Sequence, residues 1–225
     1  MDNELRITKE LIRQIEKEAK KYFIGASGCH DWSHVERVKL LALNMGRKEK
    51  ADLKIIELAA ILHDIGRKDE MKKRGLFCHA EMGAGKAKKI LRKHGFNKKL
   101  RDDIVHCIKT HRFRKNNIPK TIEAKVLFDA DKLDAIGVVG LSRAFLFAGG
   151  SGSNNIYTGN EKKLAKSGKD YLFTKEDSAI LEYELKLKYI KNGMLTETGR
   201  KVAKNRHSQM KKFVEIFWDE VKGKK

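Results

Sequence analysis

A single proline, Pro119, in 225 residues is the feature that most limits how this chain can fold. A sheet made of many short strands needs many turns, and proline and glycine are the residues that mark them. Here glycine is mostly confined to a few turns, and segments with apolar residues at helical spacing fill most of the chain. We therefore predict an all-α fold, since no strand pattern extends for more than a few residues.

The length is sufficient for one sizeable core. We predict a single domain over residues 1–225, with its core at about 28–150 and C-terminal helices at about 160–222 packed on it. Side-chain caps are expected at Thr8, Asp52 and Asn97. Helices are expected at 5–23, 31–45, 53–63, 79–94, 98–111, 119–136, 137–148, 176–191 and 198–222, with irregular loops at 67–77 and 149–155.

The charge balance is strongly basic, with 50 Lys and Arg against 30 Asp and Glu, for a net charge of +20. Such a chain suits a polyanionic partner: a nucleic acid, a nucleotide or an anionic membrane. The alternative is a solvated lysine-rich surface, because the lysines occur all along the chain and no nucleic-acid-binding motif accompanies them. Three cysteines without Cys-x-x-Cys spacing, no secretory signal and no apolar run that could span a bilayer predict a cytoplasmic protein without membrane association.

The apolar run 58–62 ends in His63 and Asp64, followed closely by Gly66. An imidazole nitrogen and a carboxylate oxygen can bind the same divalent cation. Adjacent helical residues point about 100° apart, so the two cannot share one face. At a helix C-terminus, with Gly66 in a left-handed conformation, both can reach a cation beyond the last turn. Such a site needs further ligands from elsewhere in the chain.

Two other segments supply candidates for those ligands. His34 shares an apolar helix face with Val38, although an inward histidine is also common as a hydrogen-bonded core residue. His30, one turn earlier, is a candidate substrate or supporting group. Asp131 lies in an acidic cluster between apolar flanks, where burial would demand a cation or a dense set of hydrogen bonds. Asp134, one turn further on, could orient a ligand or water; a solvated helix end is the alternative.

Together, His34, the pair His63-Asp64 and Asp131 within the sequence Asp-Ala-Asp-Lys-Leu-Asp resemble the HD superfamily of metal-dependent phosphohydrolases, named for its H…HD…D pattern. The resemblance covers residues 28 to about 149 and implies an HD-domain helical bundle. It also implies that His34, His63, Asp64 and Asp131 hold one divalent cation. Mixed nitrogen and oxygen ligation favours Mn, Co, Ni or Fe over Mg. Members of this kind include enzymes that hydrolyse nucleoside triphosphates.

The chain also departs from its relatives. Where some HD proteins carry an acidic pair soon after His-Asp, this chain has Arg67 and Lys68, which suit phosphate binding. The Gly-Tyr-Pro signature of the cyclic-dinucleotide branch is absent, and that branch binds two or three metals. His79 and His111 fall near its extra histidines. We expect one metal, with both histidines contacting phosphate or acting as acids toward the leaving group; a core role is the alternative.

These features predict a metal-dependent phosphohydrolase whose substrate is a small phosphorylated molecule, most simply a nucleoside or deoxynucleoside triphosphate cleaved to a monophosphate and pyrophosphate. Asp64, His79, His111 and Asp134 are the expected catalytic residues. His30, Arg67, Lys68 and Arg112, with Arg114 as a further candidate, are expected to bind substrate. The alternatives are a phosphomonoesterase, a cyclic-nucleotide phosphodiesterase, and a basic nucleic-acid-binding or regulatory protein with a structural metal. A homodimer is possible in each case.

Overall fold

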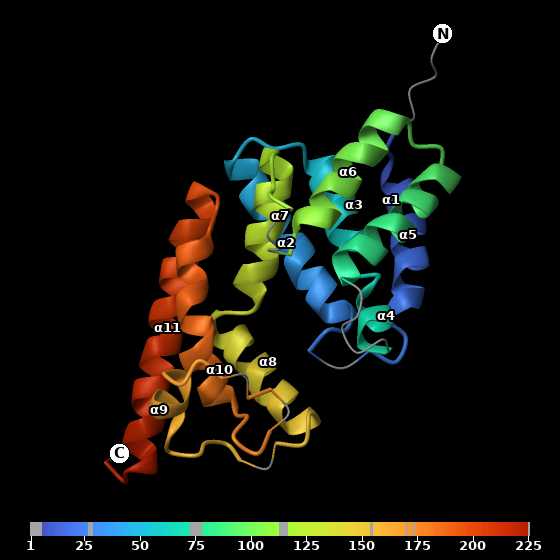
Figure 1. The fold of residues 1–225 in the computed structure, drawn as a ribbon. Coiled ribbons are helices and arrows are strands. Elements are labelled where there is room, and N and C mark those ends of the chain that lie inside the picture. The colour runs from blue at the N-terminus through green and yellow to red at the C-terminus, as the bar shows by residue number, and fades with distance from the viewer. Residues whose placement is uncertain are drawn as a thin grey trace. The chain divides into compact units, whose positions relative to one another are not determined.

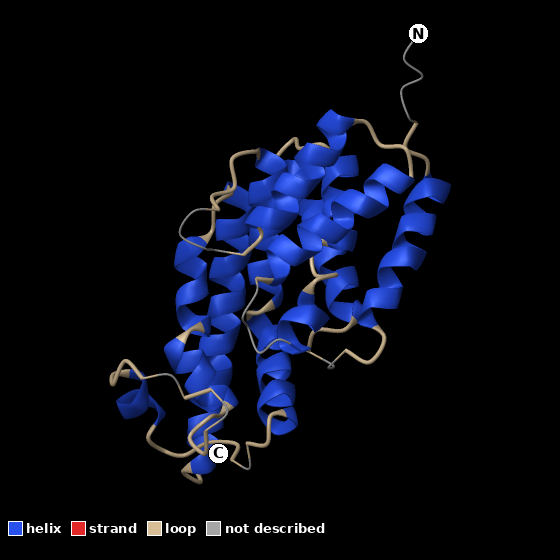
Figure 2. Cartoon of the chain, turned by 45° about the vertical axis from the view of Figure 1, so that its right-hand side comes forward, coloured by secondary structure: helices blue, strands red, loops and turns tan. Residues whose placement is uncertain are grey.

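In the computed structural model the described residues are 6–26, 29–72, 78–112, 117–153, 155–169, 171–172 and 174–224, with only the backbone described at 71 and 72. Within these ranges the chain consists of helices joined by turns and loops and contains no strand, which confirms the predicted all-α class (Figure 2). It separates into two compact units, residues 1–131 and 132–225. The predicted single domain, with the C-terminal helices packed on one core, stays a prediction.

The helices of the first unit alternate with short turns (Figure 1). They are α1 (Lys9–Lys20), the 3-10 helix η1 (Lys21–Phe23), α2 (Trp32–Lys48), α3 (Leu53–Leu62), α4 (Arg67–Lys72), α5 (His79–Lys93), α6 (Lys98–Thr110) and most of α7 (Ile122–Asp134). The second unit contains α8 (Gly137–Gly150), α9 (Glu161–Ala165), α10 (Ala179–Leu185), the 3-10 helix η2 (Leu187–Gly193) and α11 (Glu197–Val221).

Side-chain caps fix where several of these helices begin. Thr8, Asp52 and Asn97 each accept a hydrogen bond from a backbone N–H of the first turn of α1, α3 and α6, as predicted. Asp31 does the same for α2. These caps satisfy N–H groups that have no partner inside the helix. The caps at Asp31 and Asp52 thereby fix where α2 and α3 begin, and these two helices position candidate site residues.

Helix α3 is the centre of the first unit, because α1, α2, α5 and α6 all contact it. The residues 58–62 are completely buried. An apolar helix surrounded on all sides needs no polar face, which explains why its sequence shows so little amphipathic pattern. The polar pair that follows this run, His63 and Asp64, therefore also lies in the interior.

Two glycines permit close approach of neighbouring helices to α3. Gly66 does not adopt the left-handed conformation expected from the sequence. Instead, a Cβ atom there would lie 2.3 Å from the carbonyl oxygen of His79 and 2.6 Å from the backbone nitrogen of Gly83. Gly46 lies in the last turn of α2, and a Cβ atom there would meet Ile56 of α3 at 2.5 Å. Both glycines therefore serve helix packing.

Several predicted boundaries were wrong. Residues 67–72 form α4 instead of a loop, and 73–77 lie outside the described residues. Helix α7 begins at Ile122, not at Pro119, because the hydroxyl of Thr121 accepts from the N–H of Ala124 and caps it. The expected helix 176–191 is interrupted at Lys186, whose φ and ψ of −139° and −53° leave the helical region. Helix α8 extends to Gly150, into the segment expected to be a loop.

In the second unit, α8 contacts α10 and α11, and η2 also contacts α11. A pocket of about 870 Å³ in this unit is lined by α9, α10 and α11, including Trp218 and Glu161. In the part of the chain that the structure describes, no single helix is long and apolar enough to cross a membrane; only α7 and α8 together, as a bent pair, meet those criteria.

Candidate metal centre

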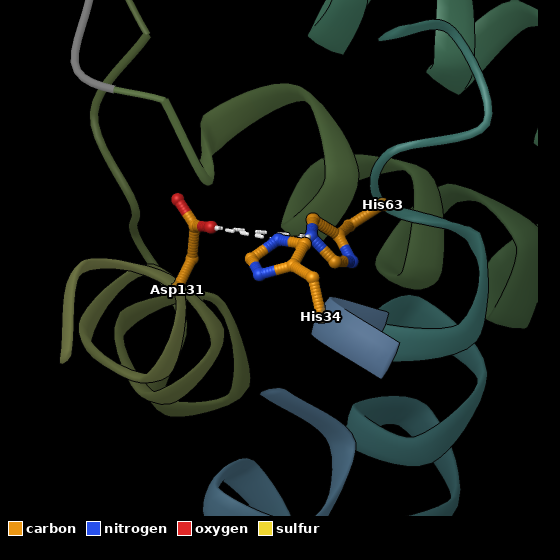
Figure 3. Close-up of side chains that lie close together, drawn as sticks. All are labelled: His34, His63 and Asp131. Carbon is orange, nitrogen blue, oxygen red and sulfur yellow. Dashed lines mark hydrogen bonds and ion pairs between the residues drawn. The ribbon is translucent and has the colours of Figure 1, made fainter. Parts of the chain in front are cut away.

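Three helices bring together a first cluster formed by His34, His63 and Asp131. His34 lies in the first turn of α2, His63 follows the last residue of α3, and Asp131 lies near the end of α7. Figure 3 shows both imidazole rings and the carboxylate of Asp131 directed toward one another. The Nε2 atoms of His34 and His63 are 3.2 Å apart, and Oδ1 of Asp131 lies 3.5 Å and 4.0 Å from them.

A second cluster is formed by Asp64, His79 and His111. His79 is the first residue of α5 and His111 follows the last residue of α6. Their Nε2 atoms are 3.1 Å apart, and they lie 3.2 Å and 3.6 Å from Oδ1 of Asp64. The sequence analysis expected His79 and His111 to lie near the metal, but it did not predict that they form a group with Asp64.

Asp64 connects the two clusters because its two carboxylate oxygens face different partners. Oδ1 faces the histidines of the second cluster. Oδ2 lies 3.7 Å from Nε2 of His34 and 3.9 Å from Nε2 of His63. Asp64 and the four histidines are at most 4% exposed. Asp131, with its side chain 17% exposed, is the more open ligand candidate.

Backbone carbonyls determine which ring nitrogen carries the proton in two of the histidines. Nδ1 of His63 lies 2.7 Å from the carbonyl oxygen of Ala60, and Nδ1 of His111 lies 2.6 Å from that of Ile108. A carbonyl only accepts hydrogen bonds, so each Nδ1 carries a proton and donates it. In the neutral rings, Nε2 then presents a lone pair to the cluster. This is the usual arrangement of a metal-binding histidine, whose other nitrogen is held by the protein.

Electrostatics favour the same protonation states. Burial lowers the pKa of His63 to about 4; Asp64 raises it, whereas His111 and His34 lower it further. Burial raises the pKa of Asp64, but the charge of Arg67 and the imidazole groups around the carboxylate bring it well below its usual value. At neutral pH a neutral imidazole and an ionised carboxylate therefore stand side by side, which is the state that binds a cation.

The donor set fits a divalent transition metal. Each cluster provides two imidazole nitrogens and a carboxylate oxygen, with the ligand atoms within 4.8 Å of one another. Lone pairs that converge in a buried space repel one another unless a proton or a cation lies between them. The mixed nitrogen and oxygen ligands suit Mn, Fe, Co or Ni better than Mg. The structure thus offers ligands for two cations, whereas the sequence analysis expected one.

Charged residues lie beside the second cluster. Nη1 of Arg67 is 3.0 Å from Nδ1 of His79, and its Nη2 is 3.0 Å from Nε2 of His30. Nη1 of Arg112 is 3.1 Å from Nδ1 of His79. The ammonium group of Lys68 donates instead to the carbonyl of Ile24. Of the predicted substrate-binding residues, Arg67 and Arg112 therefore contact His79, and His30 contacts Arg67. Arg114 lies outside the described residues.

Other predicted or candidate residues lie in different surroundings. Asp134 is buried and accepts a hydrogen bond of 2.8 Å from Arg143 of α8. His106 accepts from the backbone N–H of Lys120, away from His111. Asp129, in the same acidic segment as Asp131, is the more deeply buried of the two.

Sequence analysis missed Glu70. Its carboxylate lies on α4, with Oε2 2.6 Å from Nδ1 of His79 and Oε1 2.5 Å from Nη1 of Arg112. The signal was present as Asp69-Glu70, an acidic pair a few residues after His-Asp, but it was hidden by reading 67–77 as an irregular basic loop. Glu70 thus places an acidic group beside the metal centre, in a segment where only the cations Arg67 and Lys68 were predicted to act.

Comparison with known proteins identifies the family. The HD domain family matches residues 31–136. The uncharacterised protein YpgQ of Bacillus subtilis is 35% identical over 214 residues, covering 93% of this chain and 93% of YpgQ. The chain belongs to the HD-domain superfamily of metal-dependent phosphohydrolases. It is therefore an enzyme, and the first cluster together with Asp64 corresponds to the H…HD…D pattern from which the family was expected.

Solved HD-domain structures agree with this assignment. A crystal structure of Bacillus subtilis YpgQ in complex with ADP has a TM-score of 0.72 and 31% identity, covering 95% of this chain and 100% of that one. An HD-superfamily hydrolase from Bacillus thuringiensis has a TM-score of 0.70 and 26% identity, with 95% and 98% covered. The structural similarity to these two proteins thus extends across nearly the whole chain.

Proposed function

We propose that this HD-domain enzyme is a pyrophosphohydrolase of nucleoside or deoxynucleoside triphosphates that releases a monophosphate and pyrophosphate. The observation that carries the proposal is the arrangement around Asp64: cation ligands on both sides of one carboxylate, with two arginines beside the second cluster. A metal centre next to guanidinium groups suits a substrate with several phosphate charges. The ADP bound to YpgQ supports a nucleotide as the ligand.

In this proposal His34, His63, Asp64 and Asp131 hold a divalent cation, with Mn as the first candidate and Co, Ni, Fe or Mg as alternatives. A cation bound there supplies Lewis-acid stabilisation of phosphoryl charge and activates water as a nucleophile. The protein holds the histidine rings through carbonyls at Ala60 and Ile108, so their Nε2 atoms need no reorientation. Burial of the ligands excludes bulk water and strengthens their electrostatic effect.

His79 and His111 can serve the reaction in two ways. With Asp64 they can hold a second cation. Alternatively, they can hydrogen-bond to a phosphate oxygen or pass a proton to the leaving group. Metal stoichiometry distinguishes the two roles. Asp134 is proposed to act indirectly: its ion pair with Arg143 fixes the end of α7, three residues beyond Asp131.

Arg67 and Arg112 are proposed to bind the phosphates. Their side chains are 23% and 34% exposed, in contrast to the buried histidines beside them, so an anion can reach them from solvent. His30 contacts Arg67 and can contribute a further ring N–H donor. Lys68 is assigned a weaker role in attracting substrate, because its ammonium group already has a backbone partner. A cytoplasmic location and a homodimer stay predictions.

The test is an activity screen of the purified protein with Mn, Co, Ni, Fe and Mg against nucleoside triphosphates, nucleoside monophosphates and cyclic nucleotides. Products are separated by ion-exchange chromatography. We expect monophosphate and pyrophosphate from triphosphates, with little preference among bases. Orthophosphate released only from monophosphates would identify a phosphomonoesterase, and opening of cyclic nucleotides would identify a phosphodiesterase. Inactivity on all of them, with nucleic acid bound tightly, would support the binding-protein alternative.

A further inference from the structure

Glu70 stands at the centre of a charged group that surrounds one ring nitrogen of His79. Its Oε2 lies 2.6 Å from Nδ1 of His79 and 3.3 Å from Nη1 of Arg67, while Oε1 lies 2.5 Å from Nη1 of Arg112. The carboxylate is only 11% exposed. Its partners are an imidazole and two guanidinium groups, so the carboxylate is the acceptor in each of these contacts.

Nδ1 of His79 has two kinds of neighbour, which favour opposite protonation states of this nitrogen. The arginines lie 3.0 Å and 3.1 Å away and can only donate hydrogen bonds, so they favour a lone pair on Nδ1. An ionised carboxylate can only accept, so Glu70 favours a proton there. The contact with Glu70 is the shortest of the three, and a proton at Nδ1 makes it a hydrogen bond between a ring N–H and a carboxylate.

The choice at Nδ1 decides what the other nitrogen can do. If Nδ1 carries the proton, Nε2 of neutral His79 presents a lone pair to Asp64 and His111, which lie 3.2 Å and 3.1 Å away. If the arginines determined the tautomer, the proton would be on Nε2, in the space between these ligands. His63 and His111 have their Nδ1 protons fixed by carbonyls of their own segments. His79 depends on a side chain from another helix.

We propose that Glu70 is a positioning residue that holds His79 in the Nδ1–H tautomer and thereby keeps its Nε2 available to Asp64 and His111. Its consequence for cation binding rests on the proposed function, whereas the tautomer is a property of the resting protein. Replacement of a group that orients a metal ligand typically weakens metal affinity about 10- to 100-fold. We expect that range for the second cluster.

The first experiment measures the tautomer directly. Long-range ¹H–¹⁵N correlation spectra of the metal-free protein, with His79 assigned by its loss in a His79→Asn variant, should show the proton on Nδ1. A lone pair on Nδ1 in the unaltered protein overturns the proposal, and this measurement needs no variant of Glu70. In Glu70→Ala the arginines become the remaining neighbours, and the proton should move to Nε2; an unchanged tautomer there also overturns it.

The second experiment measures cation affinity by titration with Mn²⁺. It is made in a His34→Ala background, where the second cluster keeps all three of its ligands. Glu70→Gln, which preserves size, should weaken Mn²⁺ binding about 10- to 100-fold, and Glu70→Asp should recover part of the loss. The matched control is Asp69→Asn, the neighbouring acid of α4, which pairs with Lys86 instead of His79. Equal effects at both positions would reduce Glu70 to a structural role.

The outcomes separate this inference from the proposed function. An enzyme that cleaves triphosphates but keeps the His79 tautomer in Glu70→Ala refutes only the role of Glu70. A Glu70-dependent tautomer in a protein that releases no pyrophosphate refutes only the proposed substrate. Neither result depends on the activity of the metal-loaded Glu70 variants.

Discussion

The two clusters beside Asp64 use the same kinds of ligand in different surroundings. In the first, His63 is held by a carbonyl of its own helix, and Asp131 is partly open to solvent. In the second, His111 is likewise held by a backbone carbonyl, whereas His79 contacts Glu70 and lies beside Arg67. We therefore expect a division of labour in which either cluster can bind a cation, while the second, bordered by guanidinium groups, also meets the substrate's anionic end.

The largest expected effect is loss of both sites together through the residue they share. Asp64→Ala should abolish activity and remove bound metal, because each cluster faces one of its oxygens. Metal content is measured by inductively coupled plasma mass spectrometry, and folding by circular dichroism. A folded Asp64→Ala protein with full metal content and full activity contradicts the assignment of this centre.

The next largest effect tests whether the two clusters hold separate cations. His34→Ala should remove the cation of the first cluster, whereas His111→Ala should leave that cation bound and remove only a second one. Metal analysis of the two variants in parallel gives the answer. If His111→Ala reduces activity at unchanged metal content, the second cluster acts on phosphate instead of holding a cation. If both variants lose the same single metal, the clusters form one site.

A third effect concerns stability of the metal-free protein and distinguishes His63 from its neighbours. Its pKa is about 4 in the fold against 6.5 in its ordinary state. As pH falls below 6.5 the unfolded chain takes up a proton first, so stability present above pH 6.5 is lost progressively down to about pH 4. At about 1.4 kcal/mol for each pKa unit, the loss approaches about 3 kcal/mol.

Urea unfolding between pH 7 and 4 measures this loss, and His63→Asn is the control, in which that part of the pH dependence should vanish. Asp64, whose pKa is lowered from 3.8, contributes in the same direction only at more acidic pH. An identical pH profile in the control would show that His63 is not the group responsible.

The smallest expected effect is a change in KM, and it distinguishes two adjacent cationic side chains, Arg67 and Lys68. Arg67→Ala should raise KM for a triphosphate about 10-fold or more, the scale of one lost charge-assisted hydrogen bond, with little change in metal content. Lys68→Ala is the matched control and should change KM less than about twofold, because its ammonium group is directed to a backbone carbonyl. Equal effects would mean that both act only through general attraction of the substrate.

Much of the first cluster was predictable from sequence. The cap at Asp52 and the apolar run 58–62 placed α3 and put His63 and Asp64 at its end. The spacing of His34 on an apolar face predicted an inward side chain, which its burial confirms. These are local signals, since caps and periodicity act within one helix. Bringing Asp131 to them required the family pattern.

The second cluster was not predictable as a unit because it depends on packing between helices. Helical periodicity could not show that α5 brings His79 to within 3.1 Å of His111 at the end of α6. Glu70 was missed because α4 has only six residues and no apolar periodicity. A helix this short is stabilised by tertiary contacts, here including Glu70 with His79 and Arg112.

The contact between Gly66 and Gly83 has a consequence for the entropy of binding. Main-chain atoms after the His-Asp pair touch the start of α5 with no room for a side chain between them. Direct main-chain packing therefore sets the backbone spacing between the segments that carry His63 and His79. The ligands are ordered when the chain folds, so a cation or substrate meets a preformed arrangement and loses little affinity to immobilising the protein.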